Sequence, residues 1–365
     1  MKLSSWALFP IALPYRRKVV WANASETASP LLLLKLVAED GSVGAAEVAV
    51  KPGWFGTTFR SISVALEEMF LPLCAGLDVR DPGAFVQAAA KIPEHTAAKG
   101  LVDNALWDLR SAITRRSLRS EWGGAGRVAV SWLLTRQAPE LMAREAAEAI
   151  GQHGFREVKL KGGQGLDIDV RAIRALRAAV GSDIRILVDS NAHYGAAEMP
   201  EYLAALADEG VLAAEDPCAM QPDAAFERLQ ASVSIPILVD APAWSLRDTA
   251  LFCERGARAL ALKPGRSGLS LARAQVALAA RTGCRVHVGF GGESALGTIG
   301  ALQLAGSLTE RDSWLAAEVS YFVMLAEQVI DVDLKISAGS IAIPELAGVG
   351  ERVDWERVRR LSALQ

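Results

Sequence analysis

The chain has little of several features that mark other classes of protein. Its four cysteines, at 74, 218, 253 and 284, form no Cys-x-x-Cys pair and no zinc-binding spacing, so we expect reduced thiols and a cytoplasmic protein. The formal net charge is only -3, with both signs mixed along the 365 residues, which argues against a nucleic-acid partner. The longest early apolar run, Leu31 to Leu34, ends at Lys35 and is far too short to span a membrane.

From about Arg127 onward, short β-like runs alternate with amphipathic helical stretches. Eight such runs alternate with seven helical stretches, which is typical of a parallel α/β barrel. An open doubly wound sheet would more often carry a Gly-x-Gly-x-x-Gly turn after its first strand, and none is evident. The predicted strands cover residues 128–134, 157–161, 184–189, 212–216, 235–240, 259–263, 285–290 and 314–319.

The residues before and after this region have a different pattern. Two apolar runs, 31–37 and 43–48, flank the turn Glu39-Asp40-Gly41-Ser42 and predict a hairpin. Helical stretches follow at 61–74 and 95–114, and the tail has strand and turn character at 336–343 before a short helix from Asp354. We therefore expect an α+β capping domain over residues 1–125, a barrel over 126–320 and a segment, 321–365, that returns to the capping domain.

Two lysines lie close together in the second predicted strand, within Val158-Lys-Leu-Lys-Gly162. Side chains alternate between the two faces of a strand, so Lys159 and Lys161 share one face. A solvated strand end with two extended lysines would also produce this pattern. In a closed barrel, however, the inward face is a packed core, and two ammonium groups there require a chemical role.

Three acidic residues stand at the ends of three successive predicted strands: Asp189, Glu215 and Asp240. Each is separated from the next by one βα unit, so all three fall at the same rim on neighbouring strands. A single acid at such a position is more often a helix cap or an ion-pair partner. Three in register predict an oxygen-rich site for Mg²⁺, with Mn²⁺ as a possible substitute. Asn191 and Asp216 lie beside these residues and are candidates to orient the ligands.

A third lysine, Lys263, ends the sixth predicted strand, across the barrel from Lys161. A divalent cation between two lysines suits removal of a proton next to a carboxylate, because the cation stabilises the enediolate that develops. Lysine is ordinarily a poor base at neutral pH. Burial and neighbouring positive charge can make it a better one, and Lys159 would supply such charge to Lys161.

At this point the chain resembles the enolase superfamily, and within it the muconate-lactonizing subgroup. The resemblance rests on Lys159-Leu-Lys161 and the three acids, and on motifs spread over nearly the whole chain. These are Asp40-Gly41, Asp103-Asn-Ala-Leu-Trp-Asp-Leu109, Lys263-Pro-Gly-Arg-Ser-Gly268 and Glu293-Ser-Ala-Leu-Gly297. It implies a modified (β/α)₇β barrel of the TIM type, with an N-terminal α+β capping domain completed by the C-terminal tail, and it favours a homo-oligomer.

The resemblance also implies roles for individual residues. Asp189, Glu215 and Asp240 would bind the metal, Lys161 and Lys263 would act as base and acid, and Lys159 would support the substrate carboxylate. Glu293 would lie near the substrate. The loops 19–27 and 49–59 would close the site and carry specificity, which makes Trp54 and Phe55 candidates for substrate contact. Packing of the cap onto the barrel explains these two aromatic residues equally well.

Two features depart from the family pattern. Ala241-Pro242 follow Asp240 where the family usually has Glu-Ser, and the interval from Asp240 to Lys263 is one residue shorter than usual. The orientation of Lys263 is therefore open. His287, within the seventh predicted strand and without a partnering Asp, is interpreted as a buried structural histidine.

The predicted function is Mg²⁺-dependent removal of the proton α to a carboxylate of a small-molecule substrate. It leads to racemization or epimerization, or to cycloisomerization. The alternatives are syn-dehydration, as in o-succinylbenzoate formation, a non-catalytic paralogue that binds a carboxylate, and, more distantly, a metal-dependent aldolase.

Overall fold

The computed structural model describes residues 1–364 and begins with a three-stranded antiparallel sheet. Its strands are β1 (Leu3–Trp21), β2 (Ala24–Ala38) and β3 (Val43–Ala49), in the order β1-β2-β3. The predicted hairpin is β2 and β3, and Gly41 has the positive φ of +86° that its turn requires. Strand β1 was not predicted, because Pro10 and Pro14 interrupt it. It lies at the sheet edge, where a residue without an N–H is tolerated.

The Leu31–Leu34 run is explained by the burial of both faces of β2. Leu32 and Leu34 pack with helices of the N-terminal part, and Leu31 and Leu33 belong to the core shared with the barrel. The helices of the N-terminal part are α1 (Pro52–Phe55), α2 (Phe59–Ala65), α3 (Leu71–Cys74), α4 (Pro82–Ala89), α5 (Thr96–Thr114) and α6 (Leu118–Trp122), of which α2 to α5 contribute to the cluster around Leu32 and Leu34. The predicted continuous helix 61–74 is wrong in detail, because a π-helical turn, Leu66–Phe70, separates α2 from α3.

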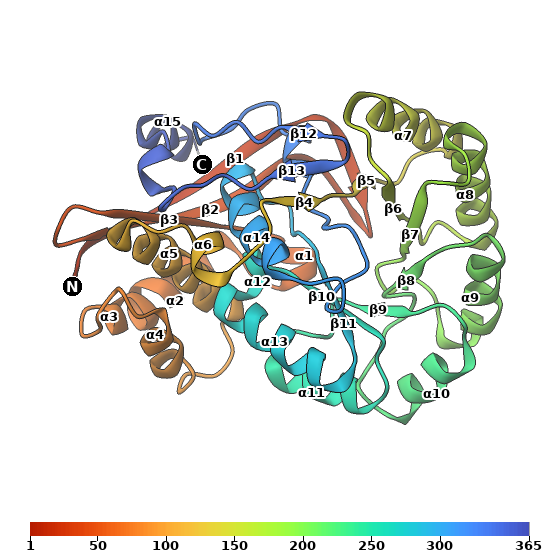
Figure 1. The fold of residues 1–365 in the computed structure, drawn as a ribbon, viewed down its shortest axis with the longest axis horizontal. Helices are drawn as coiled ribbons and strands as arrows, with labels where there is room; N and C mark the ends of the chain where they lie inside the picture. The colour runs from red at the N-terminus through yellow and green to blue at the C-terminus, as the bar shows by residue number, and fades with distance from the viewer. Residues whose placement is uncertain (365) are drawn as a thin grey trace.

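Seven parallel strands form the curled sheet of the barrel (Figure 1), so the predicted fold class is confirmed. They are β5 (Trp132–Leu134), β6 (Glu157–Lys161), β7 (Arg185–Asp189), β8 (Ala213–Glu215), β9 (Ile237–Val239), β10 (Ala259–Leu262) and β11 (Arg285–Val288). The helices between and after them are α7 (Pro139–His153), α8 (Leu166–Val180), α9 (Met199–Asp208), α10 (Ala224–Ser232), α11 (Leu246–Glu254), α12 (Pro264–Ser267), α13 (Leu269–Thr282) and α14 (Ala295–Ser307).

The first and last predicted barrel strands need correction. The run 128–134 is split into β4 (Arg127–Ala129), which pairs with the C-terminal tail, and β5, which pairs with β6. The run 314–319 is not a regular strand. Its backbone nevertheless closes the gap between the edge strands: the N–H of Glu318 donates to Val288, and the carbonyl of Ala317 accepts from Ser131.

The two faces of the barrel strands carry different side chains. Outward residues such as Val158, Leu160 and Val188 pack in the large core that the helices share. The interior is filled by a small cluster, with Leu187, Ala213, Leu238 and Ala261 among its members. Charged residues lie one step above this cluster, at the ends of the strands. None of the helices in residues 1–364 has the length and apolar character needed to cross a membrane.

The C-terminal tail contacts both parts of the molecule. Strands β12 (Ile336–Ser337) and β13 (Ser340–Ala342) extend β4 as a small antiparallel sheet. Helix α15 (Trp355–Ser362) lies beside β1, where the rings of Trp355 and Phe9 are 5.6 Å apart. The tail thus returns to the N-terminal sheet, and the domain limits at 125 and 320 stay a prediction.

Candidate active site at the barrel rim

The parallel register brings the predicted residues to one rim. Lys161 pairs with Asp189, and Asp189 with Glu215, across the neighbouring strands β6, β7 and β8. Asp240 directly follows β9, and Lys263 directly follows β10. All five residues are buried, with Lys161 the most exposed at 7%. Lys159 lies on the same inward face two residues below Lys161 and is fully buried.

Each lysine is ion-paired with rim carboxylates. The Lys161 ammonium donates to Asp189 Oδ2 at 2.5 Å, and the Lys263 ammonium donates to Asp240 Oδ2 at 2.6 Å. Lys159 lies deeper, with its Nζ 2.7 Å from both Glu215 Oε2 and Glu318 Oε2 and 3.3 Å from Asp189. Lys159 therefore holds several carboxylates together, whereas Lys161 and Lys263 each contact one.

These contacts determine the charge state of the site. Burial alone would lower the pKa of Lys159, but Glu215, Glu318 and Asp189 outweigh it and raise that pKa well above its usual value. The pKa of Asp240 is lowered to about 2, because Lys263 and Arg266 overcome the cost of burial. The pKa of Glu215, in contrast, is raised well above normal by burial and by Asp189. Glu215 is thus the rim carboxylate with the least compensation.

The surroundings of Glu215 suit a bound cation. Its Oε2 is paired with the Lys159 ammonium at 2.7 Å, but its Oε1 has no partner although the residue is fully buried. An unpaired buried carboxylate oxygen is costly, and a bound cation would reduce that cost. Asp189 and Asp240 lie on either side at adjacent strand ends and offer further oxygens. Asp189, Glu215 and Asp240 therefore fit a divalent metal such as Mg²⁺.

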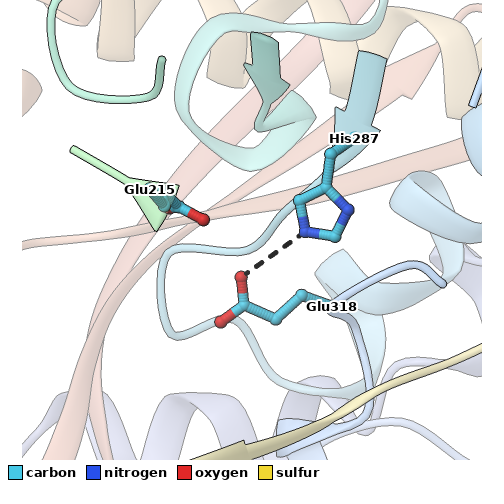
Figure 2. Close-up of side chains that lie close together, drawn as sticks. All are labelled: Glu215, His287 and Glu318. Atoms are coloured by element: carbon cyan, nitrogen blue, oxygen red, sulfur yellow. Dashed lines mark ion pairs between the residues drawn. The ribbon is translucent and has the colours of Figure 1, made fainter. Parts of the chain in front are cut away.

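A second set of potential metal ligands shares Glu215. Figure 2 shows Glu215 at the end of β8, His287 on β11 and Glu318 beyond it pointing toward one another. One ligand atom from each lies within 4.8 Å of the others. A histidine in the set favours a softer metal than Mg²⁺, whereas Asp189, Glu215 and Asp240 offer only the hard oxygens that Mg²⁺ prefers. We retain those three as the proposed ligands.

His287 lies on the inward face, below the rim, and is fully buried. Its Nε2 is 3.9 Å from Glu318 Oε2, beyond hydrogen-bond distance, and neither ring nitrogen has a hydrogen-bond partner. Burial lowers its pKa, so the ring is neutral. This placement agrees with a buried histidine, although its ring nitrogens are not satisfied as a purely structural role would require.

Asp216 and Asn191 lie against the proposed ligands. Both carboxylate oxygens of Asp216 accept backbone N–H groups, from Asp240 at 3.0 Å and Ala241 at 2.7 Å. Asp216 thereby fixes the backbone that carries Asp240. The backbone N–H of Asn191 donates to Asp189 Oδ1 at 2.9 Å, and its side-chain oxygen, which has no partner, belongs to a buried side chain at the cavity wall.

A narrow cavity lies between the barrel rim and the cap. Lys161 and Lys263 line it from the barrel, and Trp54 and Phe55 of α1 line it from the cap. Trp54 packs edge-on against Trp21 at 5.6 Å. The two predicted aromatic residues are thus placed both to pack within the cap and to contact a substrate.

Glu293 is directed into its own loop. Its carboxylate accepts the backbone N–H groups of Gly291 at 2.6 Å and Gly292 at 3.1 Å, while burial raises its pKa. The cavity wall includes Gly291 and Gly292 rather than Glu293 itself. This structure therefore shows Glu293 shaping the loop beside the cavity, and its predicted contact with substrate stays a prediction.

Asp240 is the partner of Lys263 in this structure, in the absence of a Glu at position 241. Asp240 holds Lys263, and Arg266, only 3% exposed, donates to Asp240 Oδ1 at 3.0 Å. The Arg266 guanidinium also stacks over Trp244 at 4.6 Å. Lys263 reaches the same cavity as Lys161 despite Ala241.

Sequence reasoning assigned no role to Arg266, Glu318 or Lys51. Glu318 ends the irregular eighth segment, and its in-register position after Trp314-Leu-Ala-Ala was the available signal. Burial would raise the pKa of Glu318, but Lys159 lowers it to about 2. Arg266 belongs to the motif Lys263-Pro-Gly-Arg-Ser-Gly268, which could have identified it. For Lys51, the sequence indicated only that it lies in the predicted cap loop 49–59.

Comparison with known proteins agrees with this geometry. The model of the enolase C-terminal domain-like family matches residues 141–358. Muconate cycloisomerase 1-2 of Acinetobacter lwoffii is 28% identical over 96% of this chain and 92% of its own length. The o-succinylbenzoate synthase of Geobacillus stearothermophilus is also 28% identical, over 90% of this chain and 88% of its own. The crystal structure of 2-chloromuconate cycloisomerase from Rhodococcus opacus 1CP superposes with a TM-score of 0.91 and 26% identity, covering 99% of both chains.

Proposed function

This chain belongs to the enolase C-terminal domain-like family, and from that premise we propose that it is an isomerase that removes the proton α to a substrate carboxylate. The supporting observation is the placement of two lysines in one cavity. Lys161 comes from β6, Lys263 follows β10, and the three proposed ligands lie on the strands between them. This arrangement supports racemization or epimerization, or cycloisomerization.

The proposed roles follow from these positions. A divalent cation bound by Asp189, Glu215 and Asp240 would stabilise the negative charge that develops on the substrate carboxylate. Lys161 and Lys263 face the cavity from opposite sides, so one can take the α-proton and the other can donate a proton to the opposite face. The accepting lysine must be a neutral amine, which its ion pair with a rim carboxylate disfavours, whereas the donating lysine must be an ammonium.

Lys159 has a different role in this proposal. It does not line the cavity, and its ammonium contacts Glu215, Glu318 and Asp189 instead. It would keep these buried carboxylates in place and offset their mutual repulsion. The closed, largely apolar cap, with Trp54 and Phe55, would exclude water from the reacting carbon.

The decisive experiment measures Mg²⁺-dependent exchange of α-protons in deuterated water, over a panel of N-acyl amino acids, dipeptides and muconates. We expect exchange that chelation abolishes and that Lys161→Met lowers by about 100-fold or more, as for loss of a general base. For a racemized substrate, deuterium should enter both enantiomers, and Lys263→Met should stop interconversion. The control is Lys335→Met, at a side chain 81% exposed. Mg²⁺-dependent binding without any exchange would instead indicate a non-catalytic carboxylate-binding protein.

Syn-dehydration is the second candidate, supported by the similarity to an o-succinylbenzoate synthase over 90% of this chain. It needs one base rather than two, so it tolerates any orientation of Lys263. Loss of water from a β-hydroxy acid, with no deuterium in the recovered substrate, would favour this reaction over racemization.

A further inference from the structure

One side chain, Arg136, contacts the backbone directly after the proposed base. It stands two residues beyond the end of β5 and is partly buried. Its Nε donates to the carbonyl of Gly162 at 2.7 Å. Gly162 follows Lys161, the last residue of β6. Arg136 therefore fixes the peptide on the C-terminal side of Lys161.

The turn after Lys161 is held from a second side by a buried carboxylate. Asp169, in α8, is fully buried and accepts the backbone N–H groups of Gly163 at 2.7 Å and Gln164 at 3.2 Å. Any side chain at position 163 would collide with the Arg136 guanidinium, and φ at Gly163 is +76°. The glycine thus makes room for Arg136 beside the turn.

Arg136 also holds the hairpin formed by β1 and β2. Its backbone N–H donates to the carbonyl of Val20 at 2.8 Å, and its Nη1 donates to the carbonyl of Ala22. Within residues 1–364, no other barrel residue forms a hydrogen bond with residues 19–24. Trp21 of this hairpin lies in the cavity wall. Arg136 therefore connects the part of the cap that covers the cavity to the strand end that carries Lys161.

The tip of this hairpin is strained. Trp21 pairs with Ala24, so Ala22 and Asn23 form a two-residue turn. Ala22 has a φ of +44°, in the left-handed region where glycine is preferred. A strained residue persists only where its surroundings hold it. The hydrogen bond from Arg136 to the carbonyl of Ala22 is such a contact.

We propose that Arg136 is a positioning residue for the proposed reaction, which holds Lys161 in place through Gly162 and links that position to the hairpin over the cavity. The planar guanidinium carries donors that point in different directions, so it can bridge two carbonyls on separate segments, whereas a lysine ammonium would not keep this geometry. A displacement of about 1 Å at a reacting group can cost about 100-fold in rate. This inference rests on the proposed function for the role of Lys161.

Hydrogen exchange of the Mg²⁺-loaded protein, measured by mass spectrometry, tests both contacts without a substrate. Arg136→Met should raise exchange about 10-fold or more at residues 19–24 and at residues 162–164. Exchange at residues 294–297, at another contact between cap and barrel, should not change. The matched control is Arg144→Met, at a side chain 71% exposed, which should leave all three segments as in the wild type. Unchanged exchange at 162–164 in Arg136→Met overturns the proposal.

The kinetics of α-proton exchange test the positioning of Lys161. With a substrate that the panel identifies, Arg136→Met should lower kcat by about 10- to 100-fold and change KM by less than about threefold. Arg136→Lys keeps the charge but loses the bridge, so its kcat should also fall. A merely structural role would reduce the amount of folded protein and leave the kcat of the folded fraction unchanged. A kcat within about twofold of the wild type in both variants contradicts the proposal.

A second substitution separates the hairpin from Lys161. Ala22→Gly relieves the strained φ, so in the Arg136→Met background it should slow the hydrogen exchange at residues 19–24. The double variant should keep the low kcat, because Gly162 still lacks its donor. If ordering the hairpin alone restores kcat, Arg136 acts only on the cap and the proposed positioning of Lys161 is wrong.

These outcomes are distinct from failure of the proposed function. If the wild type exchanges no α-proton, the isomerase assignment fails, while the hydrogen-exchange comparison still shows whether Arg136 holds the turn and the hairpin. If Lys161→Met abolishes α-proton exchange but the Arg136 variants keep the wild-type kcat, the isomerase assignment stands and this inference fails.

Discussion

A single buried carboxylate, Glu47, joins the N-terminal sheet to the start of α14. It lies in β3 and is 1% exposed. Its Oε1 accepts the backbone N–H groups of Ser294 at 2.6 Å and Gly297 at 2.9 Å, and its Oε2 accepts the Ser294 hydroxyl at 2.8 Å. Burial outweighs these hydrogen bonds and raises the pKa of Glu47 from 4.5 to about 7.

This raised pKa makes stability depend on pH. Between pH 4.5 and about 7 the folded protein keeps the Glu47 proton, while the unfolded chain loses it. The free energy of unfolding therefore falls as pH rises through this window, because the folded state binds more protons. A shift from 4.5 to about 7 is worth about 3 kcal/mol, at 1.36 kcal/mol for each pKa unit.

Glu47→Gln should remove this dependence without disturbing the contacts. The amide oxygen can still accept both N–H groups, and the amide NH₂ can donate to the Ser294 hydroxyl. We expect the variant to match the wild type within about 1 kcal/mol at pH 5 and to be more stable by about 3 kcal/mol at pH 8. Urea unfolding followed by tryptophan fluorescence at several pH values measures the difference.

The matched control is Glu148→Gln, at a side chain 63% exposed, which should show no such pH-dependent difference. Other buried acids titrate equally in both proteins and cancel from the comparison. If the difference in stability between Glu47→Gln and wild type is constant with pH, the reasoning is refuted. The three donors would then keep Glu47 ionised despite its burial.

Three other perturbations have definite expected outcomes. Gly44→Ala should destabilise the protein by about 1–3 kcal/mol or more in thermal unfolding, because the new Cβ would lie 2.5 Å from the Ala105 carbonyl oxygen and 2.6 Å from the Leu109 Cβ. Gly151→Ala is the matched control in helix α7. Its new Cβ would have no neighbour within 4 Å, so this variant should be more stable by about 0.5–1 kcal/mol. Asp108→Ala removes the acceptor for the N–H groups of Ala45, Val349 and Gly350, at about 1–3 kcal/mol for each buried group left unpaired, and hydrogen exchange should rise first at residues 349–350. If the exchange rates at Ala45 and at residues 349–350 do not change, Asp108 does not hold these segments in place. Saturating Mg²⁺ should raise the melting temperature, by about 2.7 kcal/mol of stability at 100 times its Kd, and Glu215→Gln should abolish the rise; an equal rise in the variant would exclude Glu215 as a ligand.

The site shows where sequence reasoning was sufficient. Lys159, Lys161 and the three acids follow short apolar runs at regular intervals, and a parallel register leaves only one rim for them. The period of two along a strand also predicted that the two lysines share a face. Glu318 was missed as part of this group although it stands in the predicted run 314–319. In the structure that segment is irregular, and hydrogen bonds to Val288 and Ser131 fix it in place.

The cap was less accessible to such reasoning. Strand β1 lacks a clear apolar alternation and contains two prolines, which an edge position tolerates and a sequence pattern penalises. The partner of Lys263 was not predicted either, because the sequence indicated only that Ala241 stands where the family usually has Glu. Arg266 and Asp240 meet through the folding of the loops that follow two different strands.

The sequence by itself therefore determined the fold class, the order of the barrel strands and the set of charged residues at their ends, because these follow from local periodicity and from the geometry of parallel strands. The tertiary structure alone decided which charge pairs with which: Lys159 with Glu318, Asp240 with Arg266, and Lys51 with Glu26. Such pairs join residues that are distant along the chain, and their distances depend on how loops and cap pack.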